Sequence, residues 1–298
     1  MIDGKRLSMS LLLLRLLQET CEKWRLRGNQ AYSNGYFSEA ENCYSQGLNC
    51  VSRNVTSKCC LRALMLCHSN RAASRMSLGR MREALADCLS AAAIDPNFLR
   101  VQVRAANCRL ALGEVEDATQ HFKKCLQSRS DICVDRKIVV DASEGLQKAH
   151  KVSSCMSCSA ELLQRRTSDD TETALGLIRD ALSVSLYSEK LLEMKAEALL
   201  MLRKYEEVIQ LCKQTIDSAE KNSTQRVADG DSVNGSEFPR LPYFHLWRLC
   251  LSFRSYFYLG RLEEALEMVE KQKGSGFEST GSGIRNTFSD HSTGTFEA

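Results

Sequence analysis

The chain has 298 residues, of which 43% are hydrophobic, 26% are charged and only three are proline. This composition can bury an apolar core, and at 7% aromatic residues it is not typical of an all-β protein. Forty basic against 37 acidic side chains leave a net charge of +3, which gives no reason to expect a nucleic-acid partner. No apolar run approaches the roughly 20 residues that a membrane span needs, so no membrane partner is expected.

In chain order, the sequence is expected to form six parts. A helical lead precedes a domain of three repeats with an insert. A connecting helix with further repeat-like units follows, and then a flexible loop, a last helix pair and a disordered tail. The lead is 1–20, the repeat domain 21–132 with its insert at 55–64, and the connecting helix with further repeat-like units 133–222. The loop is 223–242, the last helix pair 243–273 and the tail 274–298. The connecting helix is predicted at Asp135–Lys151, and the insert is expected to lengthen the flanking helices or to loop out.

Three segments align without gaps at a period of 34 residues: Cys21–Asn54, Met65–Phe98 and Leu99–Ile132. Position 15 of each segment is Gly, which can end a helix in the left-handed conformation, and position 20 is Ala, which lets a second helix approach closely. The glycines are Gly35, Gly79 and Gly113, and the alanines are Ala40, Ala84 and Ala118. The pattern predicts an all-α fold, an α-solenoid of antiparallel helix pairs.

The first helix of each pair lines the inside of such a superhelix, and five polar side chains fall on its inward positions. Arg25 and Asn29 are four residues apart in the first repeat, as are Arg100 and Arg104 in the third, so each pair shares a helix face. Asn70 holds the corresponding place in the second repeat. Guanidinium groups bind carboxylates through two hydrogen bonds, and amides donate between them. We therefore predict that the groove binds a short peptide with two carboxylates close together.

The repeat pattern resembles the tetratricopeptide repeat, and the five side chains resemble the two-carboxylate clamp of co-chaperone domains of that family. Those domains bind the C-terminal Glu-Glu-Val-Asp of the 70-kDa and 90-kDa heat-shock chaperones. The resemblance implies that Arg25, Asn29 and Asn70 hold the terminal carboxylate, and that Arg100 and Arg104 hold the Asp side chain. The family usually has Lys in place of Arg25 and Arg100, so charge is kept while geometry changes.

Residues 20–273 also resemble plant proteins that join tetratricopeptide repeats to a DnaJ domain. The stretches that carry this resemblance include CEKWRLRGNQAYSNGYFSEAENCYSQGL and EKLLEMKAEALLMLRKYEEVIQLC. None of the five histidines is followed by Pro-Asp, the tripeptide on which J-domain activity depends. We therefore predict chaperone binding by this chain, and no J domain.

The sequence allows an alternative to the chaperone adaptor and argues against an enzyme. The groove could serve a scaffold that binds another acidic peptide without chaperone linkage, with the distal repeats holding a client or another protein. An enzyme is not expected, because no catalytic, metal or cofactor motif was found. Cys155 and Cys158 have redox or zinc spacing, but no second pair lies at metal-site distance. The 14 cysteines, scattered among Leu- and Ala-rich segments, are predicted to be reduced and mostly buried in a cytoplasmic protein, with the nucleus as the alternative compartment.

Overall fold

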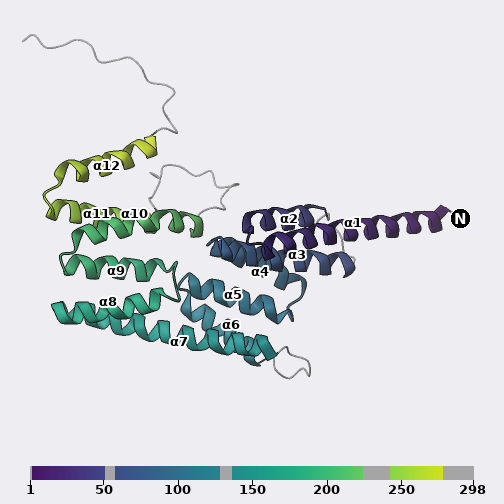
Figure 1. Ribbon diagram of the computed structural model, residues 1–298, viewed down its shortest axis with the longest axis horizontal. Coiled ribbons are helices and arrows are strands. Elements are labelled where there is room, and N and C mark those ends of the chain that lie inside the picture. The colour runs from purple at the N-terminus through teal and green to yellow at the C-terminus, as the bar shows by residue number, and fades with distance from the viewer. Residues whose placement is uncertain (1, 51–57, 128–135, 224–241, 278–298) are drawn as a thin grey trace, which may run out of the picture.

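A computed structural model describes residues 2–50, 58–127, 136–223 and 242–277, and within these ranges the chain forms twelve helices and no strand (Figure 1). The helices are α1 Ile2–Ser33, α2 Phe37–Asn49, α3 Lys58–Ser77, α4 Met81–Ile94, α5 Leu99–Ala111, α6 Val115–Gln127, α7 Arg136–Arg165, α8 Ser168–Leu182, α9 Glu189–Met201, α10 Tyr205–Asn222, α11 Tyr243–Tyr258 and α12 Leu262–Phe277. Consecutive helices pack as antiparallel pairs that stack on one another, which confirms the predicted all-α solenoid.

The turn inside a pair depends on a residue that can adopt positive φ. Gly35, Gly79 and Gly113 have φ between 73° and 81°, as the repeat pattern predicts. Gly260 repeats the turn between α11 and α12 with φ 71°, whereas Arg203 takes φ 59° between α9 and α10. The alanines at position 20 are fully buried where the second helix crosses the first. The residues that set the period therefore also set the geometry of the helix pairs.

Two helices are longer than their predicted counterparts. Helix α1 is continuous from Ile2 to Ser33, so the predicted lead at 1–20 and the first helix of the first repeat form one element. Helix α7 runs from Arg136 to Arg165 and merges the predicted connecting helix, Asp135–Lys151, with the start of the next unit. Its buried positions recur every three or four residues from Ala142 to Ser159, so one apolar face continues past the predicted end.

The remaining boundaries differ from prediction by a few residues. Helix α3 begins at Lys58, so the described part of the predicted insert, 58–64, lengthens this helix. Helix α12 continues to Phe277, beyond the predicted start of the tail at 274. Insert residues 55–57, loop residues 224–241 and tail residues 278–298 lie outside the described ranges.

The connection between α8 and α9 packs against the ends of earlier helices. The Tyr187 amide donates to the Ala111 carbonyl at 2.9 Å, and the Ser185 hydroxyl donates to the Leu110 carbonyl at 2.6 Å. Further along the chain, Asn222 at the end of α10 donates to the Gly79 carbonyl at 3.0 Å. These contacts hold the α8–α9 connection against the end of α5 and the end of α10 against the turn between α3 and α4.

Candidate functional site

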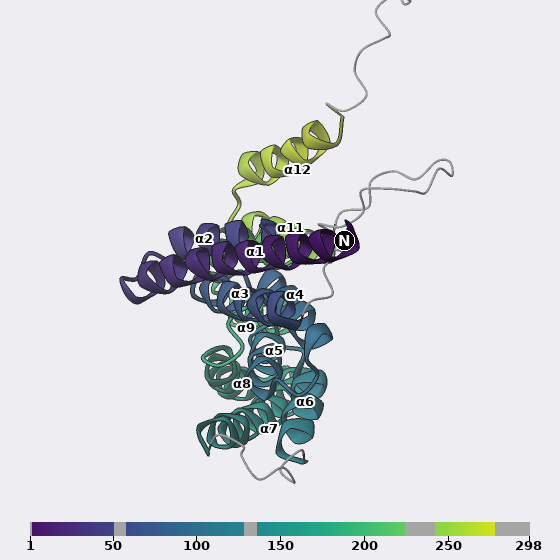
Figure 2. The ribbon, with the colours of Figure 1, turned by 90° about the vertical axis from the view of Figure 1, so that its right-hand side faces the viewer.

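The predicted groove residues lie on α1, α3 and α5, the first helices of three successive pairs. Figure 2 shows these helices one below the other, in the order of the chain. Arg25 and Asn29 come from α1, Asn70 from α3, and Arg100 and Arg104 from α5. Because each helix holds the same place in its pair, residues at corresponding positions are brought to neighbouring points of the stack.

Three of the five side chains meet at Asn29. Asn70 Nδ2 donates to Asn29 Oδ1 at 2.9 Å, and the Tyr44 hydroxyl donates to the same oxygen at 2.9 Å. With the Asn29 amide turned by 180°, its oxygen accepts from Arg25 Nη1 at 3.1 Å and its nitrogen donates to Tyr44. In either orientation Arg25, Asn29 and Asn70 are in contact across α1 and α3.

Tyr44 reaches Asn29 because position 28 is glycine. A Cβ at Gly28 would lie 2.5–2.9 Å from three atoms of the Tyr44 ring, so a larger residue would displace it. Burial raises the pKa of Tyr44 to about 12, which keeps the hydroxyl protonated and able to donate. Tyr44 is a member of the site that the repeat pattern did not predict. The sequence feature that could have indicated this contact is the combination of Tyr44 on the second helix of the first repeat with Gly28 on its first helix.

Arg104 joins the same patch from α5. Its Nη1 donates to the Ser69 carbonyl and, at 2.8 Å, to the Ser69 hydroxyl. Ser69 immediately precedes Asn70, so the half-buried Arg104 side chain lies next to the Asn70 backbone. Arg100 is one helical turn earlier on α5 and is exposed. The structure therefore brings Arg25, Asn29 and Asn70 together, bonds Arg104 to the neighbouring Ser69, and places Arg100 one turn away.

Glu22 is an acidic member of this site that the sequence analysis did not include. Its carboxylate accepts from Arg25 Nε at 2.9 Å and from Arg25 Nη2 at 2.5 Å. The hydrogen bonds from Arg25 hold the pKa of Glu22 below its ordinary value, and Glu22 in turn raises the pKa of Arg25. The spacing of three residues on one helix was the available signal. Two donors of Arg25 are thus engaged within the chain itself.

No family model matches the chain. The human DnaJ homolog subfamily C member 7 is 31% identical over 106 residues, which cover 36% of this chain and 19% of that protein. The TPR repeat-containing thioredoxin TTL4 of Arabidopsis thaliana is 27% identical over 255 residues, 84% of this chain and 32% of that protein. The chain therefore spans less than a third of the length of either relative.

Among solved structures, the TPR domain of P58(IPK) matches with a TM-score of 0.61 at 18% identity, over 84% of this chain and 59% of that one. The chain is a tetratricopeptide-repeat (TPR) superhelix. The resemblance found in the sequence is thereby confirmed, since TPR proteins recur among the relatives and the solved structures alike.

Beneath the groove, the second TPR holds a buried ion cluster. Asp87 on α4 is 2% exposed and accepts from three side chains of α3. Arg71 Nη2 lies 2.7 Å from Asp87 Oδ1, Arg75 Nη1 lies 2.8 Å from Oδ2, and His68 Nδ1 lies 2.9 Å from Oδ1. Burial by itself raises the pKa of Asp87, but the bonds from His68 and Arg71 outweigh it, so the pKa is lowered. This cluster fixes the rotation of α3, and with it the direction of Asn70.

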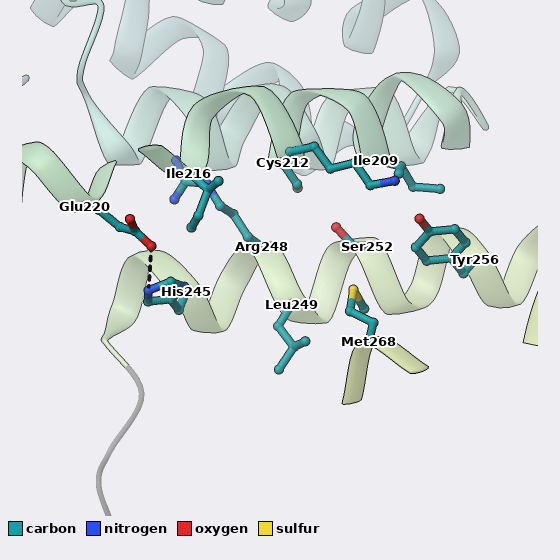
Figure 3. A pocket seen from close by; sticks show the side chains of 11 residues that line it. Ile209, Cys212, Ile216, Glu220, His245, Arg248, Leu249, Ser252, Tyr256 and Met268 are labelled. Atoms are coloured by element: carbon teal, nitrogen blue, oxygen red, sulfur yellow. Dashed lines mark ion pairs between the residues drawn. The ribbon is translucent and has the colours of Figure 1, made fainter. Parts of the chain in front are cut away.

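A hollow of about 380 Å³ lies between α10 and α11, beside the start of α12 (Figure 3). Its floor is mostly apolar, and its charged groups are already engaged. His245 lies 3.8 Å from Glu220, and the buried Arg248 lies 2.6 Å from Glu189. Within the described ranges, no cluster of three His, Cys, Asp or Glu residues could hold a metal ion. None of the described helices combines the length and apolarity needed to cross a bilayer.

Proposed function

We propose that the chain is a co-chaperone adaptor that binds the C-terminal Glu-Glu-Val-Asp tail of 70-kDa and 90-kDa heat-shock chaperones. The observation that carries this proposal is the grouping of Arg25, Asn29 and Asn70 across α1 and α3, with Arg104 of α5 bonded to Ser69 beside Asn70. Such a patch presents cationic and amide donors from the first helices of three successive pairs. The name of the human relative, a DnaJ homologue, agrees with a place among chaperone partners.

In this proposal the two carboxylates of the terminal Asp occupy different parts of the patch. Arg25, Asn29 and Asn70 hold the main-chain carboxylate, and Arg100 and Arg104 hold the side-chain carboxylate. Each charge-assisted hydrogen bond contributes about 1.5–3 kcal/mol, and ordering a free peptide tail offsets much of the sum. We therefore expect a dissociation constant on the order of micromolar, weakened by added salt.

The test is fluorescence anisotropy with a labelled peptide ending in Glu-Glu-Val-Asp. Arg104→Ala should weaken binding more than tenfold, and amidating the peptide terminus should do the same. Arg179→Ala, an exposed arginine on α8, is the matched control and should bind like the unmodified chain. Circular dichroism on each variant confirms that the helices are retained. Equal binding of the free and amidated peptides would contradict the proposal.

The alternative function, a scaffold for another acidic peptide, predicts a different result in the same assay. An internal acidic peptide without a free terminus would then bind as well as the chaperone tail. A pull-down separates the two at the level of the partner. Recovery of a heat-shock chaperone that free Glu-Glu-Val-Asp peptide displaces supports the adaptor, and recovery that the peptide does not displace supports the scaffold.

A further inference from the structure

A second hollow, of about 450 Å³, lies on the distal TPRs, where α7, α9 and α11 face one another. These are again the first helices of successive pairs, so the hollow holds the same place in its repeats as the groove on α1, α3 and α5. Its lining combines apolar and charged residues: Ala160, Leu163, Gln164, Arg166, Lys190, Met194, Glu197, Leu200, Met201 and Arg254.

The floor of this hollow is apolar and partly open to solvent. Leu163 from α7 is half-buried, and Met194 and Leu200 from α9 are 4% and 9% exposed. Met201, at the end of α9, is 38% exposed. Methionine side chains are flexible and adapt to apolar groups of different shapes. The floor can therefore accept a leucine-sized side chain of a partner.

The rim carries an excess of positive charge. Arg166, Lys190 and Arg254 line the hollow from three different segments, whereas Glu197 is the one carboxylate in the lining. Glu193, one turn before Glu197, does not line the hollow; it accepts from the Tyr243 hydroxyl and lies 3.5 Å from Lys190. In the hollow of Figure 3, His245 and Arg248 are paired with Glu220 and Glu189, and Lys213 lies 5.8 Å from the centre of the Tyr256 ring.

We propose that this distal hollow is a second peptide-binding site, which takes an acidic internal segment of a partner protein that carries leucine-sized apolar side chains. The rim attracts carboxylates on either side of the apolar group, and the floor buries that group. The lining contains no asparagine pair equivalent to Asn29 and Asn70, so a free carboxyl terminus is not part of the recognition. The groove on α1, α3 and α5 would then bind a free peptide C-terminus, and the distal hollow an internal acidic segment.

The probe for this proposal is a fluorescein-labelled peptide, Gly-Glu-Asp-Leu-Glu-Glu-Leu-Asp-Gly, with an amidated C-terminus, titrated with the full chain. Saturable binding in the micromolar range is expected. The double variant Lys190→Glu/Arg254→Glu should weaken it at least tenfold. Both residues are exposed, so the fold should tolerate the charge reversal, and circular dichroism checks this. Lys148→Glu/Arg179→Glu reverses two exposed charges on α7 and α8 outside the hollow and should leave binding unchanged.

One further variant distinguishes this site from the groove of the first three TPRs, and two altered peptides test its chemistry. Arg104→Ala should leave binding of the amidated probe intact even where it abolishes binding of the Glu-Glu-Val-Asp peptide. A peptide with lysines in place of its acidic residues should bind at least tenfold more weakly, as should one with glycines in place of its leucines. The proposal is overturned if the probe does not bind, if the lysine peptide binds equally, or if Lys190→Glu/Arg254→Glu has no effect.

Discussion

Glu22 binds the same guanidinium that the proposed clamp needs for a ligand carboxylate, since Arg25 Nε and Nη2 lie 2.9 and 2.5 Å from its two oxygens. The ion pair is internal to α1, and the Glu22 side chain is 42% exposed. A peptide carboxylate that approaches Arg25 must therefore share or replace an existing partner.

Replacing Glu22 by Gln should strengthen binding of the Glu-Glu-Val-Asp peptide. A partly exposed pair of this kind contributes up to about 1 kcal/mol, so the expected gain is about two- to fivefold. Glu19→Gln, one turn earlier and paired with Arg15, is the matched control and should have no effect. Titration by anisotropy measures both, and weaker binding of Glu22→Gln would show that Glu22 supports the ligand instead of competing with it.

Asp87→Asn should destabilise the chain strongly, because Arg71 would lose its buried counter-charge and Arg75 would keep only Glu41 and Glu83. Breaking a buried ion pair in this way costs about 3–5 kcal/mol. Asp180→Asn removes an exposed carboxylate that lies 3.7 Å from Lys151 and should cost less than about 1 kcal/mol. Urea unfolding of the two variants gives the comparison, and a similar small loss in both would contradict a structural role for the cluster.

The same carboxylate should make stability depend on acid pH. The pKa of Asp87 is lower in the folded chain than in the unfolded one, so its contribution is complete above the ordinary value of about 4. The stabilisation by Asp87 is lost as the pH falls from its unfolded pKa to its lower folded pKa. Thermal unfolding between pH 6 and pH 3 should show this loss, and Asp87→Asn should flatten the curve. If the unfolding temperature of Asp87→Asn falls with pH as steeply as that of the unmodified chain, other groups cause the acid sensitivity.

Alanine substitutions at Gly113 and Gly35 separate the cost of positive φ from the cost of steric overlap with neighbouring atoms. Both have φ near 80°, where a side chain costs about 1–2 kcal/mol. A Cβ at Gly35 would meet nothing within 4 Å, whereas one at Gly113 would overlap the Ser188 hydroxyl and lie 2.5 Å from its Cβ. Gly113→Ala should therefore lose at least twice as much unfolding free energy as Gly35→Ala. Equal losses would mean that the start of α9 moves freely.

Thiol reactivity should separate Cys158 and Cys250 from the other described cysteines. These two are exposed, whereas Cys21, Cys60, Cys67, Cys88 and Cys108 are fully buried. Cys158 and Cys250 should react with Ellman's reagent in the native chain, and Cys158→Ser/Cys250→Ser should reduce the fast phase by two thiols per chain. The buried thiols should react on unfolding. Fast labelling of Cys67, whose pKa is raised chiefly by its bond to Cys21, would contradict the burial.

The repeat period predicted the fold and the grouping of Arg25, Asn29, Asn70 and Arg104, because it fixes both the helix phase and the stacking of equivalent positions. Arg25, Asn29 and Asn70 are in contact and Arg104 is bonded to the neighbouring Ser69, and the roles of these residues in binding stay predictions. The full lengths of α1 and α7 were not predicted. Each helix continues past its predicted boundary because of packing, and the sequence carries no turn signal at that boundary. Glu22 was overlooked although its spacing from Arg25 was visible in the sequence.

Most solenoids transmit force only between neighbouring units, and their repeats can detach one at a time. In this chain the bonds from Ser185 to Leu110 and from Asn222 to Gly79 fasten units that are far apart in sequence. Tension applied to the two ends would have to break these hydrogen bonds before α7–α10 could separate from α3–α6. The segment from α4 to α10 should consequently resist stretching as one unit, whereas the end helices α1–α2 and α11–α12 lie outside these bonds.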